Sequence, residues 1–217
     1  MTNQSQKHGF DMENSIRTNV FHLKEVSNDT NTHDIPCSQN PFDPGENISI
    51  KCSGGTRIEC GDIQRFYNYD FTKKNTIIFI HWEQNTDTTK IIKRIYEIDY
   101  NQLLHTHLFG TITLKKIEEY VRFIKSIPPG QKAQKQYKVE REDMKRELQQ
   151  IHNMTAVIHP KVDSKKQRRV QCSFNIMKIP AAYITYTSPE ETPSLLRKIE
   201  LPLTFESCRR KFNNKLK

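Results

Sequence analysis

The chain has 217 residues, of which 35% are hydrophobic and 27% are charged, so it can form one sizeable core or one core with a basic appendage. No stretch approaches 18 consecutive apolar residues, and the sequence therefore predicts no membrane-spanning helix. The formal net charge of +9 is unevenly spread, because residues 1–109 carry 11 Lys and Arg against 14 Asp and Glu, whereas residues 110–217 carry 23 against 11.

The basic second half favours a polyanionic partner, since each phosphate that a lysine or arginine neutralises releases counterions. The N-terminal residues Met1 to His8 are polar and lack the apolar segment of a signal peptide. The five cysteines are an odd number without a CxxC pair: Cys37, Cys52, Cys60, Cys172 and Cys208. Reduced thiols and an intracellular, cytoplasmic location are the simplest interpretation. A zinc site built from Cys37, Cys52, Cys60 and a histidine is an alternative, but the spacing fits no usual pattern.

In chain order, the first predicted element is a helix over residues 10–26. Its apolar positions recur at steps of three and four: Met12, Ile16, Val20, Leu23 and Val26. A short extended piece around Asp34 is followed by a turn rich in proline and glycine at residues 40–46. Residues 47–52 then alternate as a strand, with Ser49 and Lys51 on the side opposite Ile48 and Ile50.

Asp62 is a candidate N-cap for a helix that runs to about Tyr69. Residues 76–82 are a continuous apolar run, typical of a strand buried on both faces, and residues 88–99 are predicted to form its neighbour. Thr113 can cap a helix that ends before Pro128 and whose apolar stripe is Leu114, Ile117, Val121 and Ile124.

Residues 131–152 are predicted to form a long, highly charged helix, and shorter strands follow at residues 156–159, 170–174 and 181–186. The order of elements predicts an α/β protein whose mixed β-sheet core is flanked by helices and carries a basic extension of helices and strands. Pro128-Pro129-Gly130 is the best hinge, which divides the chain into residues 1–127 and 128–217.

Asp34, Ser49 and Lys51 form the pattern that carries chemistry. If the segment around Asp34 pairs with the strand at residues 47–52 as a hairpin, Asp34 comes close to Lys51. Mg²⁺ prefers carboxylate oxygens, and hydrolysis of a phosphodiester needs a metal ion together with an activated water. A nearby lysine can position that water and stabilise the developing charge.

With its helix, hairpin, second helix and apolar strand in this order, the region of residues 10–82 resembles the PD-(D/E)XK nuclease superfamily of restriction and repair endonucleases. The resemblance implies a restriction endonuclease-like fold and a Mg²⁺ site in which Asp34 binds the metal ion, Lys51 is the catalytic lysine and Glu13 is the carboxylate of the preceding helix.

Two positions depart from the family pattern. Ser49 stands where the family usually has Glu or Asp, and His33 stands where it has Pro. Some restriction enzymes of the superfamily carry Ser here and recruit a carboxylate from the following segment, for which Glu59 is the first candidate and Asp62 the second.

The densest basic run is residues 161–169. Its candidate DNA-contacting residues are Lys161, Lys165, Lys166, Gln167, Arg168 and Arg169. Arg168 and Arg169 are the candidates for reading sequence, because a guanidinium can bind guanine through two hydrogen bonds. Arg65 beside the proposed site is a candidate phosphate contact, and Gln64 could orient a metal-bound water.

Other catalytic patterns are not supported. His105 and His107 would lie on one side of a strand, but they lack further metal ligands and are interpreted as structural. No cysteine–histidine pair has the spacing of a nucleophilic site, and the phosphate-binding glycine motifs are absent.

The leading hypothesis is a type II restriction-like endonuclease, with a nuclease-like core in residues 1–127 and a basic DNA-contacting region in residues 128–217 that packs on it. Its substrate would be double-stranded DNA, and a palindromic site would require a homodimer. One alternative is a nucleic-acid-binding protein whose nuclease-like core is inactive because Ser49 replaces an acid. The other is a DNA-repair nuclease that recognises structure.

Overall fold

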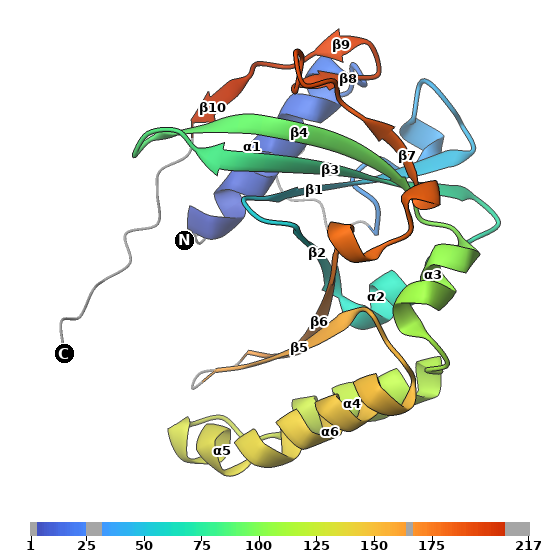
Figure 1. The fold of residues 1–217 in the computed structure, drawn as a ribbon. Coiled ribbons are helices and arrows are strands. Elements are labelled where there is room, and N and C mark those ends of the chain that lie inside the picture. The colour runs from blue at the N-terminus through green and yellow to red at the C-terminus, as the bar shows by residue number, and fades with distance from the viewer. Residues whose placement is uncertain (1–3, 25–31, 164–166, 207–217) are drawn as a thin grey trace. The chain divides into compact units, whose positions relative to one another are not determined.

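The computed structural model describes residues 4–24, 32–163 and 167–206 (Figure 1). The chain divides into two compact units, each built from separate segments. The first unit comprises Met1–Gly55, Thr76–Ile98 and Ile184–Lys217, and the second comprises Thr56–Asn75 and Asp99–Tyr183. This differs from the predicted division at residue 128, because the chain passes between the units four times and no composition shift marks those crossings.

The first unit is a helix packed on a five-stranded sheet. Its elements are α1 (Gln4–Asn19), a 3-10 turn (Cys37–Gln39), β1 (Glu46–Ser53), β3 (Lys74–Gln84), β4 (Thr89–Asp99), β7 (Ile184–Thr187), β8 (Leu195–Leu196), β9 (Ile199–Glu200) and β10 (Thr204–Glu206). The sheet order is β1-β3-β4-β10, and β7 also pairs with β4. The coarse prediction of an α/β protein with sheets flanked by helices is confirmed.

The core of the first unit lies between α1 and one face of the sheet. Figure 1 shows α1 crossing this sheet. The predicted stripe of α1 is buried, with Met12, Ile16 and Val20 at most 4% exposed, and it packs with Ile48 and Ile50 of β1. The same cluster takes residues from the neighbouring strands, which are Ile78, Ile80, Ile92 and Ile95. The predicted helix over residues 10–26 is displaced relative to α1, which begins at Gln4 and ends at Asn19, and Val26 of the predicted stripe lies outside the described residues.

A tight hairpin in the first unit is attached to the sheet by one arginine. Arg197 and Lys198, between β8 and β9, both have positive φ, as a two-residue hairpin turn of type I′ requires. Arg197 donates to the carboxylates of Glu97 at 2.7 Å and of buried Glu46 at 3.0 Å. Although burial alone would lower the pKa of Arg197, its hydrogen bonds to Glu46 and Glu97 raise it. These ion pairs explain why an arginine occupies a turn position that favours glycine or asparagine.

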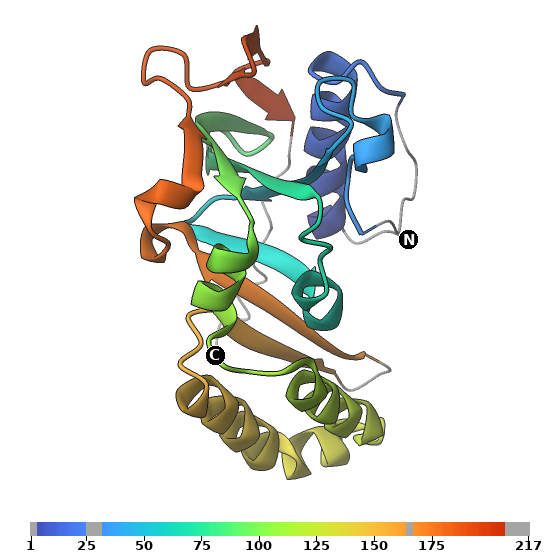
Figure 2. The same ribbon diagram turned by 90° about the vertical axis from the view of Figure 1, so that its right-hand side faces the viewer.

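The second unit is a three-stranded antiparallel sheet with helices. Its elements are β2 (Arg57–Asp62), α2 (Ile63–Tyr67), α3 (Gln102–Phe109), α4 (Leu114–Ser126), α5 (Gln131–Gln136), α6 (Lys138–Ile151), β5 (Val157–Val162), β6 (Arg168–Asn175) and two 3-10 turns (Ile176–Lys178 and Ala181–Tyr183). The strand order is β2-β6-β5, and Figure 2 shows α4 and α6 lying next to each other.

One face of the second sheet is apolar and faces the core of that unit. Its buried residues are Ile58, Ile158, Val170, Cys172 and Phe174. α4 contacts β6, and its predicted stripe of Ile117, Val121 and Ile124 is buried. Thr113 caps α4 as expected, because its hydroxyl accepts from the Lys116 amide. The helix period in the sequence therefore predicted α4 correctly.

Three local predictions for the second unit were wrong. His105 and His107 lie in α3 instead of a strand, and their ring nitrogens contact the carbonyl oxygens of Tyr67 and Lys178 at 3.1 and 3.2 Å. The predicted long helix over residues 131–152 is divided at Tyr137 into α5 and α6. β2 was not anticipated, since only Ile58 of its six residues is buried and its apolar alternation is weak. Across the described segments 4–24, 32–163 and 167–206, no helix has the length and apolar character to cross a membrane.

Candidate active site

The predicted hairpin forms at the edge of the first sheet. Ile35 and Ile48 make an antiparallel bridge, in which each amide donates to the other's carbonyl at 3.0 and 2.8 Å. Because both isoleucines are fully buried, the bridge is held by core packing as well as by hydrogen bonds. The bridge brings Asp34, the residue before Ile35, next to the middle of β1.

Asp34 and Lys51 are in direct contact, as the hairpin predicts. Lys51 Nζ lies 3.1 Å from Asp34 Oδ2, and the two side chains are 26% and 19% exposed. The Ile50 amide also donates to Asp34 Oδ2, and the Arg17 guanidinium of α1 donates to the Asp34 carbonyl oxygen. Asp34 is therefore fixed at both its backbone and its carboxylate, while the ion pair keeps access to solvent.

Two further charges act on Cys52, the residue after Lys51. Burial raises the pKa of the Cys52 thiol to about 12, the positive charges of Lys51 and Lys90 oppose the shift, and the negative charges of Asp34 and Glu13 add to it. Glu13 of α1, the predicted helix carboxylate, therefore acts on the same thiol as Asp34 does.

Lys90 and Trp82 were not predicted as members of this site. Lys90 on β4 is only 4% exposed, and its Nζ lies 3.5 Å from the centroid of the Trp82 ring. The ring also lies against Gly54, where a Cβ would come within 3.0 Å of two ring atoms. The only signal for Lys90 in the sequence is its occurrence in an apolar strand, where a buried lysine needs compensation by charges or an aromatic ring.

Ser49 corrects one expectation. It lies two residues before Lys51 on β1, so strand alternation puts both on the same side, but Ser49 is only 2% exposed. The side of β1 that carries both residues is therefore closed at Ser49, whereas the Lys51 side chain is 26% exposed. The neighbouring strands carry large apolar residues such as Ile77 and Phe79, which are also buried.

The other predicted catalytic and metal-binding residues belong to the second unit. Glu59 is an exposed residue of β2, and Asp62 caps α2 by accepting from the Arg65 amide at 3.1 Å. Gln64 is partly buried in α2, and Arg65 is exposed there. The candidate site is accordingly built from residues of the first unit alone.

The side chains of the candidate site suit Mg²⁺ better than Zn²⁺. Among residues 4–24, 32–163 and 167–206, no group of three His, Cys, Asp or Glu side chains could hold a metal ion, so the zinc alternative finds no support. Mg²⁺ often needs only one or two protein carboxylates, because substrate phosphate and water supply the remaining oxygens. Asp34, with Glu13 as a second carboxylate that acts on the same thiol, fits such a minimal set and does not fit a complete protein cage.

The basic run at residues 161–169 forms the end of the β5–β6 hairpin in the second unit. Lys165 and Lys166 lie outside the described residues. Lys161 is partly buried, Arg169 is exposed, and Gln167 is tied to the turn because its amide donates to Asp163 Oδ1 at 3.0 Å.

Arg168 corrects a second expectation. Its guanidinium donates to the carbonyls of Ile127, Asp163 and Gln167 at 2.7, 2.8 and 2.7 Å, and to that of Pro128. Its side chain is only 10% exposed. The donors that would bind a guanine are thus occupied by backbone, so Arg168 holds the hairpin in place and does not fit the predicted reading of base edges.

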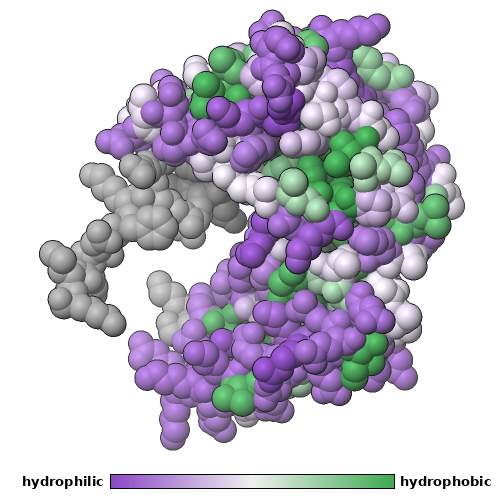
Figure 3. Space-filling view, in the orientation of Figure 1, coloured by the Kyte–Doolittle hydropathy of each residue, from purple (hydrophilic) through white to green (hydrophobic). Residues whose placement is uncertain are grey.

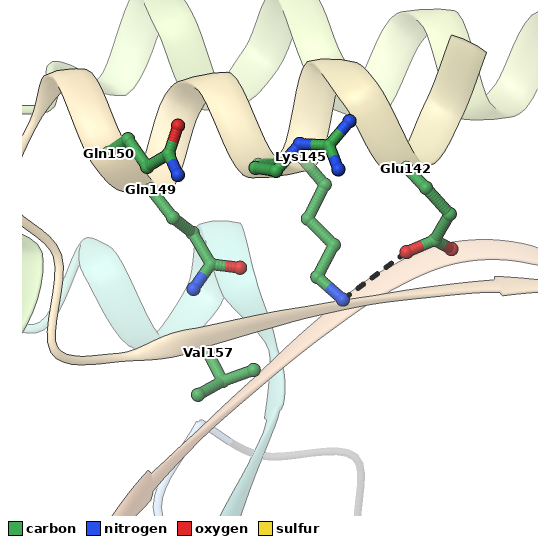
Figure 4. A pocket seen from close by; sticks show the side chains of 6 residues that line it. Glu142, Lys145, Gln149, Gln150 and Val157 are labelled. Atoms are coloured by element: carbon green, nitrogen blue, oxygen red, sulfur yellow. Dashed lines mark hydrogen bonds and ion pairs between the residues drawn. The ribbon is translucent and has the colours of Figure 1, made fainter. Parts of the chain in front are cut away.

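A groove of about 440 Å³ lies in the second unit between α6 and β5 (Figure 4). It is lined by Glu142, Lys145, Arg146, Gln149, Gln150 and Val157. Lys145 lies 3.4 Å from Glu142, and Arg146 is paired with Asp143. Because neighbouring carboxylates neutralise both cations and no nucleophile lines the groove, it is a weaker candidate than the Asp34–Lys51 pair.

Comparisons of this chain with protein-family models, with curated proteins and with solved structures returned no match.

Proposed function

We propose that this protein is a Mg²⁺-dependent endonuclease that hydrolyses phosphodiester bonds of double-stranded DNA. The observation that supports the proposal is the 3.1 Å contact between Lys51 Nζ and Asp34 Oδ2, held by the bridge between Ile35 and Ile48. A carboxylate and a lysine side by side, partly open to solvent, are the groups that metal-assisted phosphodiester hydrolysis requires.

Each residue has a stated role in this proposal. Asp34 and Glu13 would hold Mg²⁺, which when bound neutralises the scissile phosphate and lowers the pKa of a water. Lys51 would orient the attacking water and stabilise charge that develops on the phosphate. The Ile50 amide fixes the Asp34 carboxylate, and Lys90 adds a positive charge that acts on Cys52, the residue after Lys51.

The finer proposal is a type II restriction-like enzyme of restriction endonuclease-like fold. It rests on the resemblance of residues 10–82 to the PD-(D/E)XK pattern and on the order of α1, the Asp34 hairpin and the buried strand β3. Cleavage at a palindromic sequence would then require a homodimer, because a two-fold site is matched by a two-fold protein.

The second candidate function is DNA binding without catalysis. It is favoured by the burial of Ser49 at the position of the usual second acid, and by the lack of a three-ligand cluster in the described part of the chain. The two candidates differ only in whether DNA is cut, so a cleavage assay separates them.

The test is incubation of supercoiled plasmid with the purified chain in Mg²⁺ or in EDTA. The endonuclease proposal expects nicked or linear DNA in Mg²⁺ alone, and discrete fragments would favour a restriction-like enzyme over a structure-specific nuclease. DNA that stays intact while a gel shift shows binding would support the second candidate.

Two variants test the site. Lys51→Ala and Asp34→Asn are each expected to lower the cleavage rate at least about 100-fold, the scale of one electrostatic catalytic group. Lys93→Ala is the matched control, because Lys93 lies on β4 of the same unit and its side chain is 46% exposed. Wild-type cleavage by Lys51→Ala would remove Lys51 from the mechanism.

A further inference from the structure

The second unit carries all of the net positive charge of this chain. Its segments 56–75 and 99–183 hold 20 Lys and Arg against 11 Asp and Glu, whereas the first unit holds 14 of each. The excess of nine positive charges thus belongs to the unit that does not contain the Asp34–Lys51 pair. A charge separation of this kind suggests that binding and chemistry use different parts of the chain.

Within the second unit the charge is concentrated where α4 ends and α5 and α6 begin. Residues 120–139 contain no Asp or Glu, and their five basic residues are all exposed: Arg122, Lys125, Lys132, Lys135 and Lys138. Lys132 and Lys135 are three residues apart on α5 and therefore share a face. Figure 3 shows a largely hydrophilic surface over α5 and α6.

The fold adds the β5–β6 hairpin to this region. Arg168 donates to the carbonyls of Ile127 and Pro128 in the α4–α5 connection, and the side-chain amide of Gln134 on α5 donates to the Val162 carbonyl at 3.0 Å. Lys161 and Arg169 are paired across the same hairpin end. These bonds bring two basic segments that lie about 30 residues apart in sequence to one place.

The helices beneath this surface are packed against each other. The Phe123 and Tyr137 ring centroids lie 6.4 Å apart, which joins α4 to the start of α6, and the Tyr120 hydroxyl donates to the Arg141 carbonyl at 2.9 Å. The exposed cations are therefore carried by helices that contact one another.

We propose that a basic patch in the second unit binds the phosphate backbone of double-stranded DNA without reading its sequence. The patch consists of Arg122, Lys125, Lys132, Lys135, Lys138, Lys161 and Arg169. Exposed lysines suit phosphates, whereas Arg168, which could have read bases, is occupied by backbone carbonyls. The choice of DNA as the polyanion rests on the proposed function.

The acidic residues near the patch do not cancel it. Asp163 is engaged, because it accepts from the Gln167 amide and lies 3.9 Å from Arg168 Nη1. Glu140, two residues beyond Lys138, is exposed at the border of the patch. Glu119 on α4 is paired with Lys116 at 3.0 Å, and this hydrogen bond lowers its pKa, with a further contribution from the charge of Arg122. Seven cations face these three carboxylates, so the potential stays positive and attracts phosphate.

The experiment is fluorescence anisotropy of a labelled duplex of about 30 base pairs, titrated in EDTA at several KCl concentrations from about 50 to 200 mM. EDTA prevents metal-dependent cleavage, so only binding is measured. The test variant carries Lys132→Ala, Lys135→Ala and Lys138→Ala. The matched control carries Lys73→Ala, Lys115→Ala and Lys178→Ala, which removes the same charge from exposed positions elsewhere in the second unit.

The patch variant is expected to bind at least about 10-fold more weakly than wild type, and the slope of log K against log salt should become shallower by about 2 to 3. The control should stay within about 3-fold of wild type. If both triple variants bound DNA equally weakly, the loss would come from net charge alone and the patch would be overturned. Unchanged binding by the patch variant would also overturn it. Preference for a single-stranded RNA of equal length would overturn the choice of double-stranded DNA.

The basic-patch inference and the endonuclease proposal can fail independently in this design. If the patch variant loses binding and wild type never cuts plasmid in Mg²⁺, the inference stands and the endonuclease proposal falls. If wild type cuts plasmid and the patch variant binds DNA as wild type does, the endonuclease proposal stands and the patch is wrong.

Discussion

His159 and Ser173 are joined across the strands β5 and β6, with His159 Nε2 2.7 Å from Ser173 Oγ. Burial is the main cause that lowers the pKa of His159 from 6.5 to about 4; the positive charges of Lys161, Arg57 and Lys145 contribute to this shift, and the charge of Glu142 opposes it. The ring is thus neutral in the folded protein at pH 7. The three cations that contribute lie near enough to the ring for their charge to act on it.

The first prediction concerns how stability depends on pH. The pKa of His159 is lower in the folded chain than its ordinary value of 6.5, so the unfolded chain binds the proton first as the pH falls. The stabilising contribution is therefore complete above pH 6.5 and is lost as the pH falls towards 4. We expect a loss of about 1–2 kcal/mol over this range, because solvent at the partly buried ring screens part of the full effect.

Urea denaturation at several pH values between about 4 and 7.5 measures how the free energy of unfolding depends on pH. His159→Gln keeps a hydrogen-bonding group for Ser173 but cannot take up the proton, so its stability should fall less steeply with decreasing pH than that of wild type. Part of the slope should remain, since burial also lowers the pKa of His105. An identical pH slope for wild type and His159→Gln would contradict the assignment.

The second prediction separates the structural role of Asp34 from its charge. Asp34 Oδ2 accepts from the Ile50 amide, which lies in a strand position that is 5% exposed. Asp34→Ala leaves that amide without this acceptor and is expected to cost about 1–3 kcal/mol of unfolding free energy. Asp34→Asn retains an oxygen acceptor and should cost less, while it removes the charge that pairs with Lys51.

Chemical denaturation of the three proteins checks the order of stability, wild type above Asp34→Asn above Asp34→Ala. The cleavage assay should not follow this order, because both variants lose the carboxylate and are expected to be equally inactive. If Asp34→Asn proved as unstable as Asp34→Ala, the hydrogen bond to Ile50 would not be what holds the side chain.

The third prediction compares two neighbouring arginines. Arg168→Ala removes four hydrogen bonds to backbone carbonyls and is expected to destabilise the second unit by about 2–4 kcal/mol. Arg169→Ala, at an exposed position, should change the unfolding free energy by no more than about 0.5 kcal/mol. Arg169→Ala should stay folded but bind DNA more weakly than wild type, because it removes one cation of the basic patch.

Arg168→Lys provides a further check, because one ammonium group cannot reach carbonyls of four residues arranged around a planar guanidinium. We expect it to be closer in stability to Arg168→Ala than to wild type. Full stability of either Arg168 variant would mean that the hairpin is attached to the α4–α5 connection in another way.

The sequence by itself determined several of the local elements and one contact between residues 17 positions apart. The apolar periods of α1, α4 and β1 predicted their buried faces, and Thr113 and Asp62 were recognised as helix caps because a short polar side chain can accept from a free amide. The contact between Asp34 and Lys51 followed from pairing two extended segments across a short turn. Hairpin geometry is local, so the pattern of residues was sufficient to predict it.

Only the tertiary structure decided which segments share a unit and which polar residues are occupied. Lys90 on β4 acts on Cys52 of β1, and Ser49 is only 2% exposed. Arg168 donates to the carbonyls of Ile127 and Pro128, which precede it by 41 and 40 residues. Each outcome depends on which chain segments pack together, and a residue's own neighbours in sequence carry no information about that. Burial and hydrogen-bond partners are properties of the assembled fold, and they decide whether a charged side chain is available to a ligand.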